Sequence, residues 1–148
     1  MINTVITSAK VSENTKMGGH VLQHIYGQTP PTKDFSQLDK TLFTNAAQYE
    51  GIWNAYRNST KISNPAKCTK ITDSPHNFDV LLTKLPGQPE SIEAYQCREV
   101  DDDKRCTRYV PTQVTTVNFG FKYQKERNKA NQNWVLNTAY PGYSRPSN

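Results

Sequence analysis

Two of the three histidines in this 148-residue chain, His20 and His24, stand four positions apart. On a helix, residues i and i+4 lie on one face, with their Cβ atoms about 5–6 Å apart. Imidazole titrates near neutral pH, so two such side chains can form an acid/base unit. The same spacing suits two ligands of a metal ion, and a purely structural or surface role for either histidine is the simpler alternative.

A zinc site has little further support in the sequence. Zinc proteases with this histidine spacing carry a glutamate directly after the first histidine, and Val21 stands there instead. No two of the three cysteines have Cys-x-x-Cys spacing, and His76 has no diagnostic neighbour. We therefore expect no metal and no cofactor, and keep a metal-dependent hydrolase built on the histidine pair as an alternative.

A second candidate pair lies in the last predicted strand, residues 134–140. Strand side chains alternate between faces, so Thr138 and Tyr140 should point the same way, about 7 Å apart. Strict alternation also places Trp134 and Leu136 on that face. The opposite face should then carry Val135, Asn137 and Ala139. A hydroxyl and a phenol side by side can donate hydrogen bonds to an oxyanion.

Helices are predicted before strands in the elements that must position these groups. Residues 20–26 fit a short helix, and residues 44–57 form an amphipathic one with apolar side chains at three- and four-residue spacing. Later segments read as strands over 78–84, 92–98, 105–110, 114–123 and 134–140. This order predicts an α+β protein whose N-terminal helices pack on a C-terminal antiparallel sheet. Residues 1–17 read as a linker or disordered arm, and residues 18–148 as a single domain.

Cysteine and charge add weaker constraints. Cys97 and Cys106 flank an acidic turn and would face each other across a hairpin, either as a disulfide or as two reduced thiols. The net charge of +5 favours an anionic partner such as nucleic acid. A basic cluster near one strand turn could contact phosphates or simply be solvated: Lys122, Lys125, Arg127 and Lys129. No apolar run is long enough to span a membrane.

Together, two histidines and two neutral donors suit metal-independent RNA cleavage. A base takes the proton of the 2′-hydroxyl, the 2′-oxygen attacks the adjacent phosphorus, and an acid protonates the departing 5′-oxygen. The products would be a 2′,3′-cyclic phosphate and a 5′-hydroxyl. This chemistry requires the histidine helix to pack against the face of the last strand that carries Thr138 and Tyr140.

Three short motifs, in this order, resemble the bacterial RNase A-like toxin domain. They are Gly18-Gly19-His20 with His24 shortly after, Phe43-Thr44-Asn45-Ala46-Ala47 leading into a helix, and the closing Leu136-Asn137-Thr138-Ala139-Tyr140-Pro141. The resemblance implies a kidney-shaped α+β ribonuclease. Domains of this family lie at the C-terminus of contact-dependent growth inhibition effectors and other polymorphic toxins. The related barnase/EndoU/colicin-type toxin fold also puts helices before a sheet and stays open as an alternative.

The resemblance also assigns roles. His24 matches the family's catalytic histidine, and Thr138 and Tyr140 match its C-terminal Thr-x-Tyr pair. The family's downstream basic residue, commonly arginine, corresponds to Lys40, with Lys33 as an alternative. Lysine supplies a point charge and no bidentate fork. The gap between the histidines is one residue shorter than in the family, so His20 and His24 could exchange roles.

These observations lead to one hypothesis and two alternatives. We expect an endoribonuclease toxin that cleaves RNA, for instance tRNA, after delivery from a secreted or cell-surface effector into the cytoplasm of a target bacterium. The resemblance implies a cognate immunity protein as its partner in a heterodimer. The alternatives are a non-catalytic basic binding module and the metal-dependent hydrolase.

Overall fold

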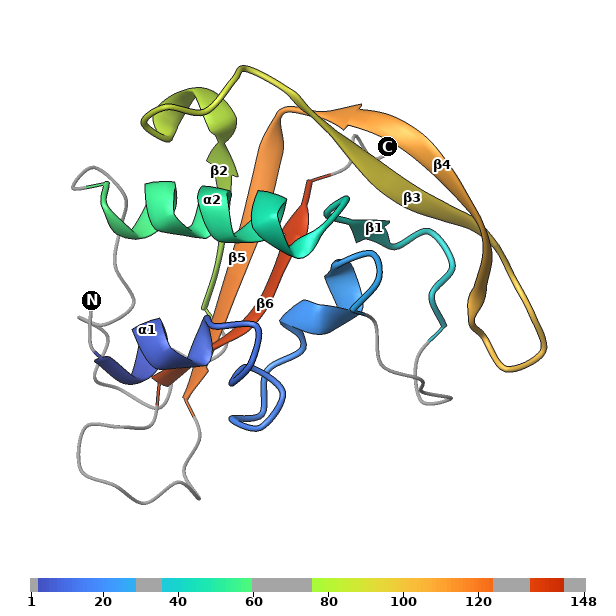
Figure 1. Cartoon of the computed structure of the whole chain (residues 1–148), viewed down its shortest axis with the longest axis horizontal. Coiled ribbons are helices and arrows are strands. Elements are labelled where there is room, and N and C mark those ends of the chain that lie inside the picture. The colour runs from blue at the N-terminus through green and yellow to red at the C-terminus, as the bar shows by residue number, and fades with distance from the viewer. Residues whose placement is uncertain (1–2, 29–35, 60–75, 124–133, 143–148) are drawn as a thin grey trace.

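The computed structural model describes residues 3–28, 36–59, 76–123 and 134–142. This part of the chain is α+β, with two small antiparallel sheets and few helices (Figure 1). In chain order the elements are the helix α1 (Asn3–Ser8), the 3₁₀ helix η1 (Val21–His24), β1 (Thr41–Leu42), α2 (Ala46–Arg57), β2 (His76–Leu81), the 3₁₀ turn η4 (Leu82–Lys84), β3 (Ile92–Val100), β4 (Cys106–Val114), β5 (Thr116–Tyr123) and β6 (Trp134–Pro141).

The strands form two sheets, where the sequence predicted one. One sheet has the order β1-β3-β4 and the other β2-β5-β6, and every pairing is antiparallel. Between them the chain passes from β4 into β5 with one residue, Thr115, in the connection. The five predicted strands correspond to β2–β6, although residues 82–84, predicted as strand, form η4, and β1 was not predicted. Apolar and β-branched runs mark strands locally, while partner choice depends on distant segments.

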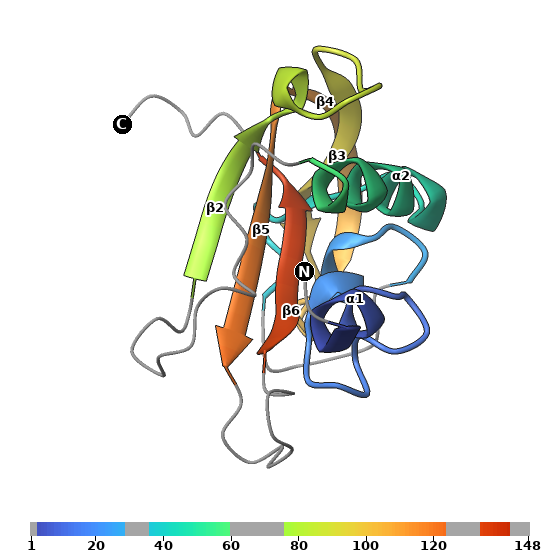
Figure 2. The ribbon, with the colours of Figure 1, turned by 90° about the vertical axis from the view of Figure 1, so that its left-hand side faces the viewer.

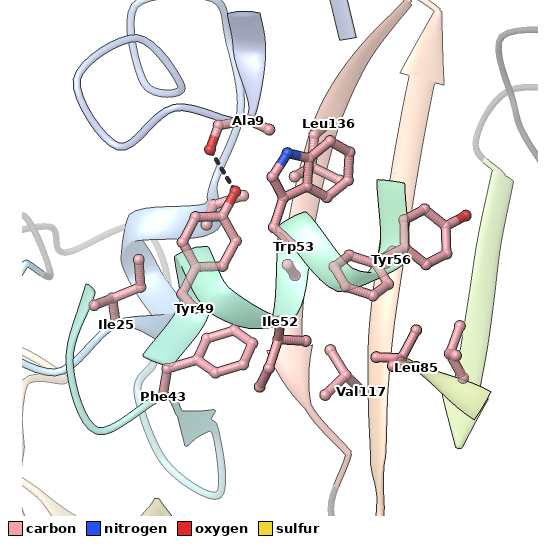
Figure 3. Packing of buried hydrophobic residues seen from close by; sticks show 14 of the residues in the cluster. Ala9, Ile25, Phe43, Tyr49, Ile52, Trp53, Tyr56, Leu85, Val117 and Leu136 are labelled. Carbon is pink, nitrogen blue, oxygen red and sulfur yellow. Dashed lines mark hydrogen bonds between the residues drawn. The ribbon is translucent and has the colours of Figure 1, made fainter. Parts of the chain in front are cut away.

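Helix α2 confirms the predicted amphipathic helix. Its N-cap is Asn45, whose side-chain oxygen accepts the Gln48 backbone N–H at 2.8 Å. The apolar stripe of α2 belongs to the main hydrophobic cluster together with buried residues of β5 and β6 (Figure 3). Within it, the rings of Tyr56 and Phe119 lie 4.3 Å apart. Local periodicity therefore identified both the helix and the face that it buries.

Residues expected to form a linker or disordered arm are part of this core. Helix α1 occupies residues 3–8, and Val5 and Ala9 are buried in the main cluster. The Tyr49 hydroxyl donates a 2.5 Å hydrogen bond to the Ala9 carbonyl oxygen, which joins this segment to α2 (Figure 3). The segment looked unstructured because its few apolar residues show no long period, yet it contacts β6 through α1 and α2 through Ala9.

Strand β6 contains a bulge at Asn137. Consecutive β5 residues Gly120 and Phe121 pair with Thr138 and Leu136, so the register passes over the residue between them. One extra residue on one strand of an antiparallel pair breaks the alternation of side chains at that point.

The bulge corrects the predicted faces of β6. Leu136 and Ala139 both lie in the buried core, although strict alternation puts them on opposite faces. Thr138 and Tyr140 share a face as predicted, but it is the face turned away from that core. The two donors are therefore separated from Leu136, which was expected beside them.

Candidate functional site

His20, His24 and Lys40 line one small cavity together with Gln23. Its volume is about 140 Å³. The histidines come from the two ends of the η1 segment, and the lysine comes from the residue just before β1. The short helix predicted over residues 20–26 is a 3₁₀ helix of residues 21–24, with His20 as its N-cap. The predicted proximity of the histidines holds, although the geometry behind that prediction does not.

His24 is held in one tautomer by the backbone of β1. Its Nδ1–H donates to the Thr41 carbonyl oxygen at 2.9 Å, which puts the lone pair of the neutral ring on Nε2. Phe43 N–H donates to the His24 carbonyl oxygen at 2.7 Å and fixes the main chain. Burial lowers the pKa of His24 to about 4, against the opposing effect of the Thr41 carbonyl, while the charges of Lys40 and His20 lower it further. At neutral pH this ring is an uncharged base.

His20 is attached to the edge of β6. Its backbone N–H donates to the carbonyl oxygen of the bulged Asn137 at 2.5 Å, which brings η1 against that strand. Its side chain is exposed. Partial burial lowers the pKa of His20, followed by the positive charges of Lys122 and Lys40. Two cations therefore act on this imidazole, a setting that also suits a phosphate.

Tyr140 joins the histidine cavity to a larger hollow on the outer face of β2, β5 and β6. The rings of Tyr140 and His24 lie 5.1 Å apart with an interplanar angle of 36°. Tyr140 and Thr138 line the larger hollow, whose volume is about 720 Å³. The structure thus places Tyr140 against His24, and Thr138 further along the same face. Neither Thr138 nor Tyr140 is among the residues that line the small cavity.

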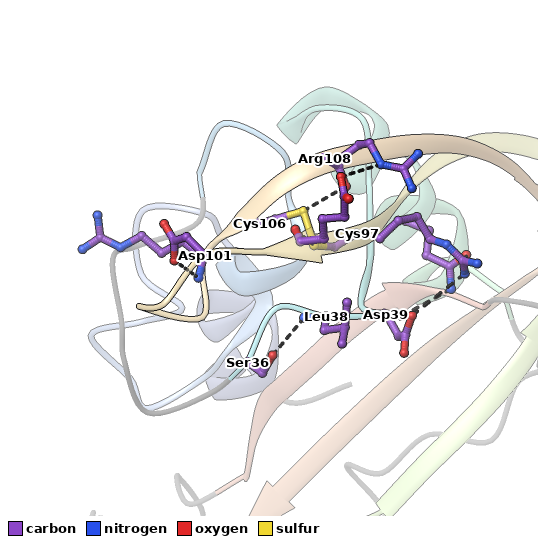
Figure 4. Close-up of a disulfide and its surroundings, with 11 residues drawn as sticks. Ser36, Leu38, Asp39, Cys97, Asp101, Cys106 and Arg108 are labelled. Atoms are coloured by element: carbon purple, nitrogen blue, oxygen red, sulfur yellow. Dashed lines mark hydrogen bonds and ion pairs between the residues drawn. A yellow bond between two sulfur atoms is a disulfide. The ribbon is translucent and has the colours of Figure 1, made fainter.

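Lys40 is positioned by the hairpin of β3 and β4. Cys97 N–H donates to the Lys40 carbonyl oxygen at 2.9 Å, and Asp39 N–H donates to the Cys97 carbonyl oxygen at 2.8 Å. Asp39 has a φ of 64°, in the left-handed region that aspartate tolerates better than most residues. Cys97 is joined to Cys106 by a disulfide, one of the two states that the sequence left open (Figure 4). Burial lowers the pKa of the Lys40 ammonium.

Asn14 organises the segment that carries the histidines, and the sequence interpretation missed it. The side chain is fully buried. Its Nδ2 donates to the Ser8 carbonyl oxygen at 2.7 Å and to the Leu136 carbonyl oxygen at 2.8 Å, while Oδ1 accepts Val21 N–H at 2.9 Å. Asn14 thus connects α1, η1 and β6.

Gly19 explains one part of the motif around the first histidine. A Cβ at this position would overlap the Asn14 side chain. The glycine before His20 is therefore required by a buried amide five residues upstream of it, and no spacing rule reveals this. A polar residue surrounded by unpatterned sequence gives no local signal of burial.

The basic residues fall into two groups. Lys122 of β5 acts electrostatically on His20 and so belongs to the surroundings of the histidines. Lys125, Arg127 and Lys129 lie outside the described residues, as do Lys33 and Cys68. Lys40 therefore takes the cationic position at the cavity, and the structure does not bear on its alternative, Lys33.

Comparison of the chain with protein-family models, with curated proteins and with solved structures gives no match. Within the described ranges, no helix is both long and apolar enough to cross a membrane. Over the same ranges, no group of three or more histidine, cysteine, aspartate or glutamate side chains is arranged to hold a metal ion. The chemistry of the cavity must therefore be argued from its own side chains.

Proposed function

We propose that this protein is an endoribonuclease that cleaves RNA by attack of a 2′-hydroxyl on the neighbouring phosphorus. The observation that carries the proposal is the small cavity, where a neutral, tautomer-fixed His24 lies with His20, Lys40 and, against its ring, Tyr140. A general base must be unprotonated and within reach of its proton. His24 meets the first condition through burial and presents Nε2 through its bond to Thr41.

In the proposed reaction His24 Nε2 takes the proton from the 2′-hydroxyl. The 2′-oxygen forms a bond to phosphorus, and the bond between phosphorus and the 5′-oxygen breaks. His20, in its protonated form, gives a proton to that 5′-oxygen as it leaves. The products are a 2′,3′-cyclic phosphate and a free 5′-hydroxyl, so atoms and charge balance without water or a metal ion.

The cations of the cavity and the neighbouring hydroxyl stabilise the negative charge on the phosphorane. Lys40 lines the cavity, and Lys122 acts on His20 from β5. Donors fixed in advance where negative charge develops stabilise a transition state more than they stabilise the substrate. The Tyr140 hydroxyl belongs to this group. Thr138 lines the neighbouring hollow, so we assign it to binding of the RNA beside the cavity.

Incubation of folded protein with single-stranded RNA in excess EDTA tests the proposal. We expect cleavage to products that end in a 2′,3′-cyclic phosphate, identified by mass spectrometry. His24→Ala and His20→Ala should each lower the rate by about 10²–10⁴-fold, and Lys40→Ala should lower it as well. Intact RNA, or activity that EDTA abolishes and Zn²⁺ or Mn²⁺ restores, would refute this mechanism and favour an alternative.

A matched control separates catalysis from charge and folding. Lys84→Ala removes the same charge from an exposed side chain in η4, away from the cavity. This control should leave the rate within about twofold of the parent. A loss with Lys84→Ala as large as with His24→Ala would show that RNA cleavage does not depend on this cavity.

We further propose that the arrangement is RNase A-like, with helices packed on the sheet, and that the ribonuclease serves as a toxin. Support comes from the three sequence motifs, which resemble toxin domains delivered into target bacteria and blocked by a cognate immunity protein. Expression in the bacterial cytoplasm should then stop growth, and His24→Ala should restore it. Normal growth with soluble, active protein would contradict the toxin role and leave the ribonuclease proposal standing.

A further inference from the structure

The larger hollow on the outer face of β2, β5 and β6 has a polar floor built from two cross-strand rows. We call this hollow the outer recess. Six polar side chains line it: Asn77, Asp79, Thr116, Asn118, Thr138 and Tyr140. In the first row Asn77, Gly120 and Thr138 stand opposite one another, and in the second Asp79, Asn118 and Tyr140 do so. Antiparallel sheets commonly have one face on the core and one polar face towards water, so these side chains are accessible to a polar ligand.

Gly120 stands at the centre of the first row. A Cβ at this position would overlap the Asn77 side-chain oxygen and the Thr138 methyl group. The glycine therefore lets these two side chains approach each other over its backbone. The volume of about 720 Å³ lies within the range of about 300–1,000 Å³ typical of small-molecule sites. The labelled helices lie on the other side of this sheet (Figure 2).

Asp79 and Asn118 define the hydrogen-bonding character of the floor. Asn118 is almost fully buried, and its Nδ2 donates to Asp79 Oδ1 at 2.9 Å. A carboxylate only accepts hydrogen bonds, so the amide orientation is fixed and the Asn118 oxygen is turned away from Asp79. The pair therefore offers acceptors: the remaining capacity of the carboxylate and an amide oxygen. A complementary ligand must present adjacent donors.

We propose that the outer recess binds the base of the nucleotide on the 5′ side of the scissile phosphate, and that it prefers guanine. This inference rests on the proposed ribonuclease function for the position of the phosphate. Guanine presents N1–H and N2–H side by side, and a carboxylate can accept both. Cytosine and adenine offer one amino group on that edge, and uracil offers a single ring N–H. Single-stranded RNA presents these edges freely.

Tyr140 links base recognition to cleavage. It lines the recess and its ring lies against His24, so a nucleotide whose base sits over Asp79 directs its sugar and 3′-phosphate towards the histidine cavity. The 2′-hydroxyl of that nucleotide is the group that His24 must deprotonate. Cleavage after guanosine follows from this order of sites.

Binding of the four nucleoside 3′-monophosphates to the intact protein tests the inference without relying on catalysis. Calorimetric titration should give 3′-GMP the tightest binding, by about tenfold or more over 3′-UMP. Asp79→Asn, which replaces one accepting oxygen by a donor, should reduce that preference to about twofold or less. Asp102→Asn, the same change on the exposed turn between β3 and β4, should leave it unchanged. Equal binding of all four nucleotides, or a preference that survives Asp79→Asn, would overturn the proposal.

Sequencing of cleavage ends separates this inference from the proposed function. Fragments that end in guanosine 2′,3′-cyclic phosphate support both. Cleavage with no base preference, together with equal nucleotide binding, overturns the recess and leaves the ribonuclease. A 3′-GMP preference that depends on Asp79, without any RNA cleavage, supports the recess and refutes the ribonuclease.

Discussion

Replacement of Asn14 by alanine should be among the most damaging single changes in this protein. Asn14 is fully buried and makes three hydrogen bonds to backbone groups of α1, η1 and β6. Each such bond contributes about 1 kcal/mol net, and each buried backbone group left without a partner costs about 1–3 kcal/mol. Asn14→Ala should therefore lower the free energy of unfolding by roughly 3–5 kcal/mol, a large share of the roughly 5–15 kcal/mol of a typical domain.

Urea unfolding followed by circular dichroism measures this loss. The midpoint should fall while the slope m stays constant, since the same surface is exposed on unfolding. The melting temperature should fall by about 6–20 °C, at about 2–4 °C per kcal/mol for a chain of this size. Asn54→Ala is the matched control, because Asn54 is exposed on α2, and it should change stability by less than about 0.5 kcal/mol.

Two outcomes would refute the reasoning about Asn14. A loss below about 1 kcal/mol would mean that the three bonds are not made together in solution. A loss equal to that of Asn54→Ala would mean that residues 3–21 do not contribute to the cooperative unit. A further readout is hydrogen exchange at the Val21 amide, which should be protected in the parent and should exchange much faster in Asn14→Ala.

The remaining predictions concern pH, two glycines and the disulfide. The kcat/KM for RNA should rise as the pH passes the pKa of His24, about 4, because the general base must be neutral. It should fall above the pKa of His20, which lies below 6.5, because the general acid must keep its proton. A maximum at or above pH 7 would contradict these roles. Gly120→Ala should lower the free energy of unfolding in urea by about 1–3 kcal/mol, because its Cβ overlaps side chains from both neighbouring strands. Gly51→Ala, in open space on α2, should raise it by about 0.5–1 kcal/mol. Equal effects would show that Gly120 is not closely covered by its neighbours. Reduction of the Cys97–Cys106 bond, whose cysteines are nine positions apart, should lower the free energy of unfolding by roughly 2.5 kcal/mol. It should also lower RNA cleavage, because it loosens the loop that carries Lys40. Unchanged cleavage after complete reduction would show that the hairpin does not position the site.

Local pattern alone determined α2, the positions of β3–β6 and most of β2, and the hairpin that bears the two cysteines. The three- and four-residue spacing of Tyr49, Ile52, Trp53 and Tyr56 identified both a helix and its buried face, because a helical period brings those side chains together whatever lies opposite. The histidine pair was also found from spacing, because residues only four positions apart stay near each other in any compact local fold.

Only the tertiary structure decided how the candidate site is assembled. The bulge at Asn137 turned Thr138 and Tyr140 away from the core, and it depends on how β6 pairs with β5. Lys40 reaches the cavity because the Cys97 backbone holds its loop, and Asn14 became a central residue by reaching β6 across more than a hundred positions. These features depend on the register and docking of segments far apart in the chain. That information lies in the complementarity of surfaces, and no spacing along the sequence expresses it.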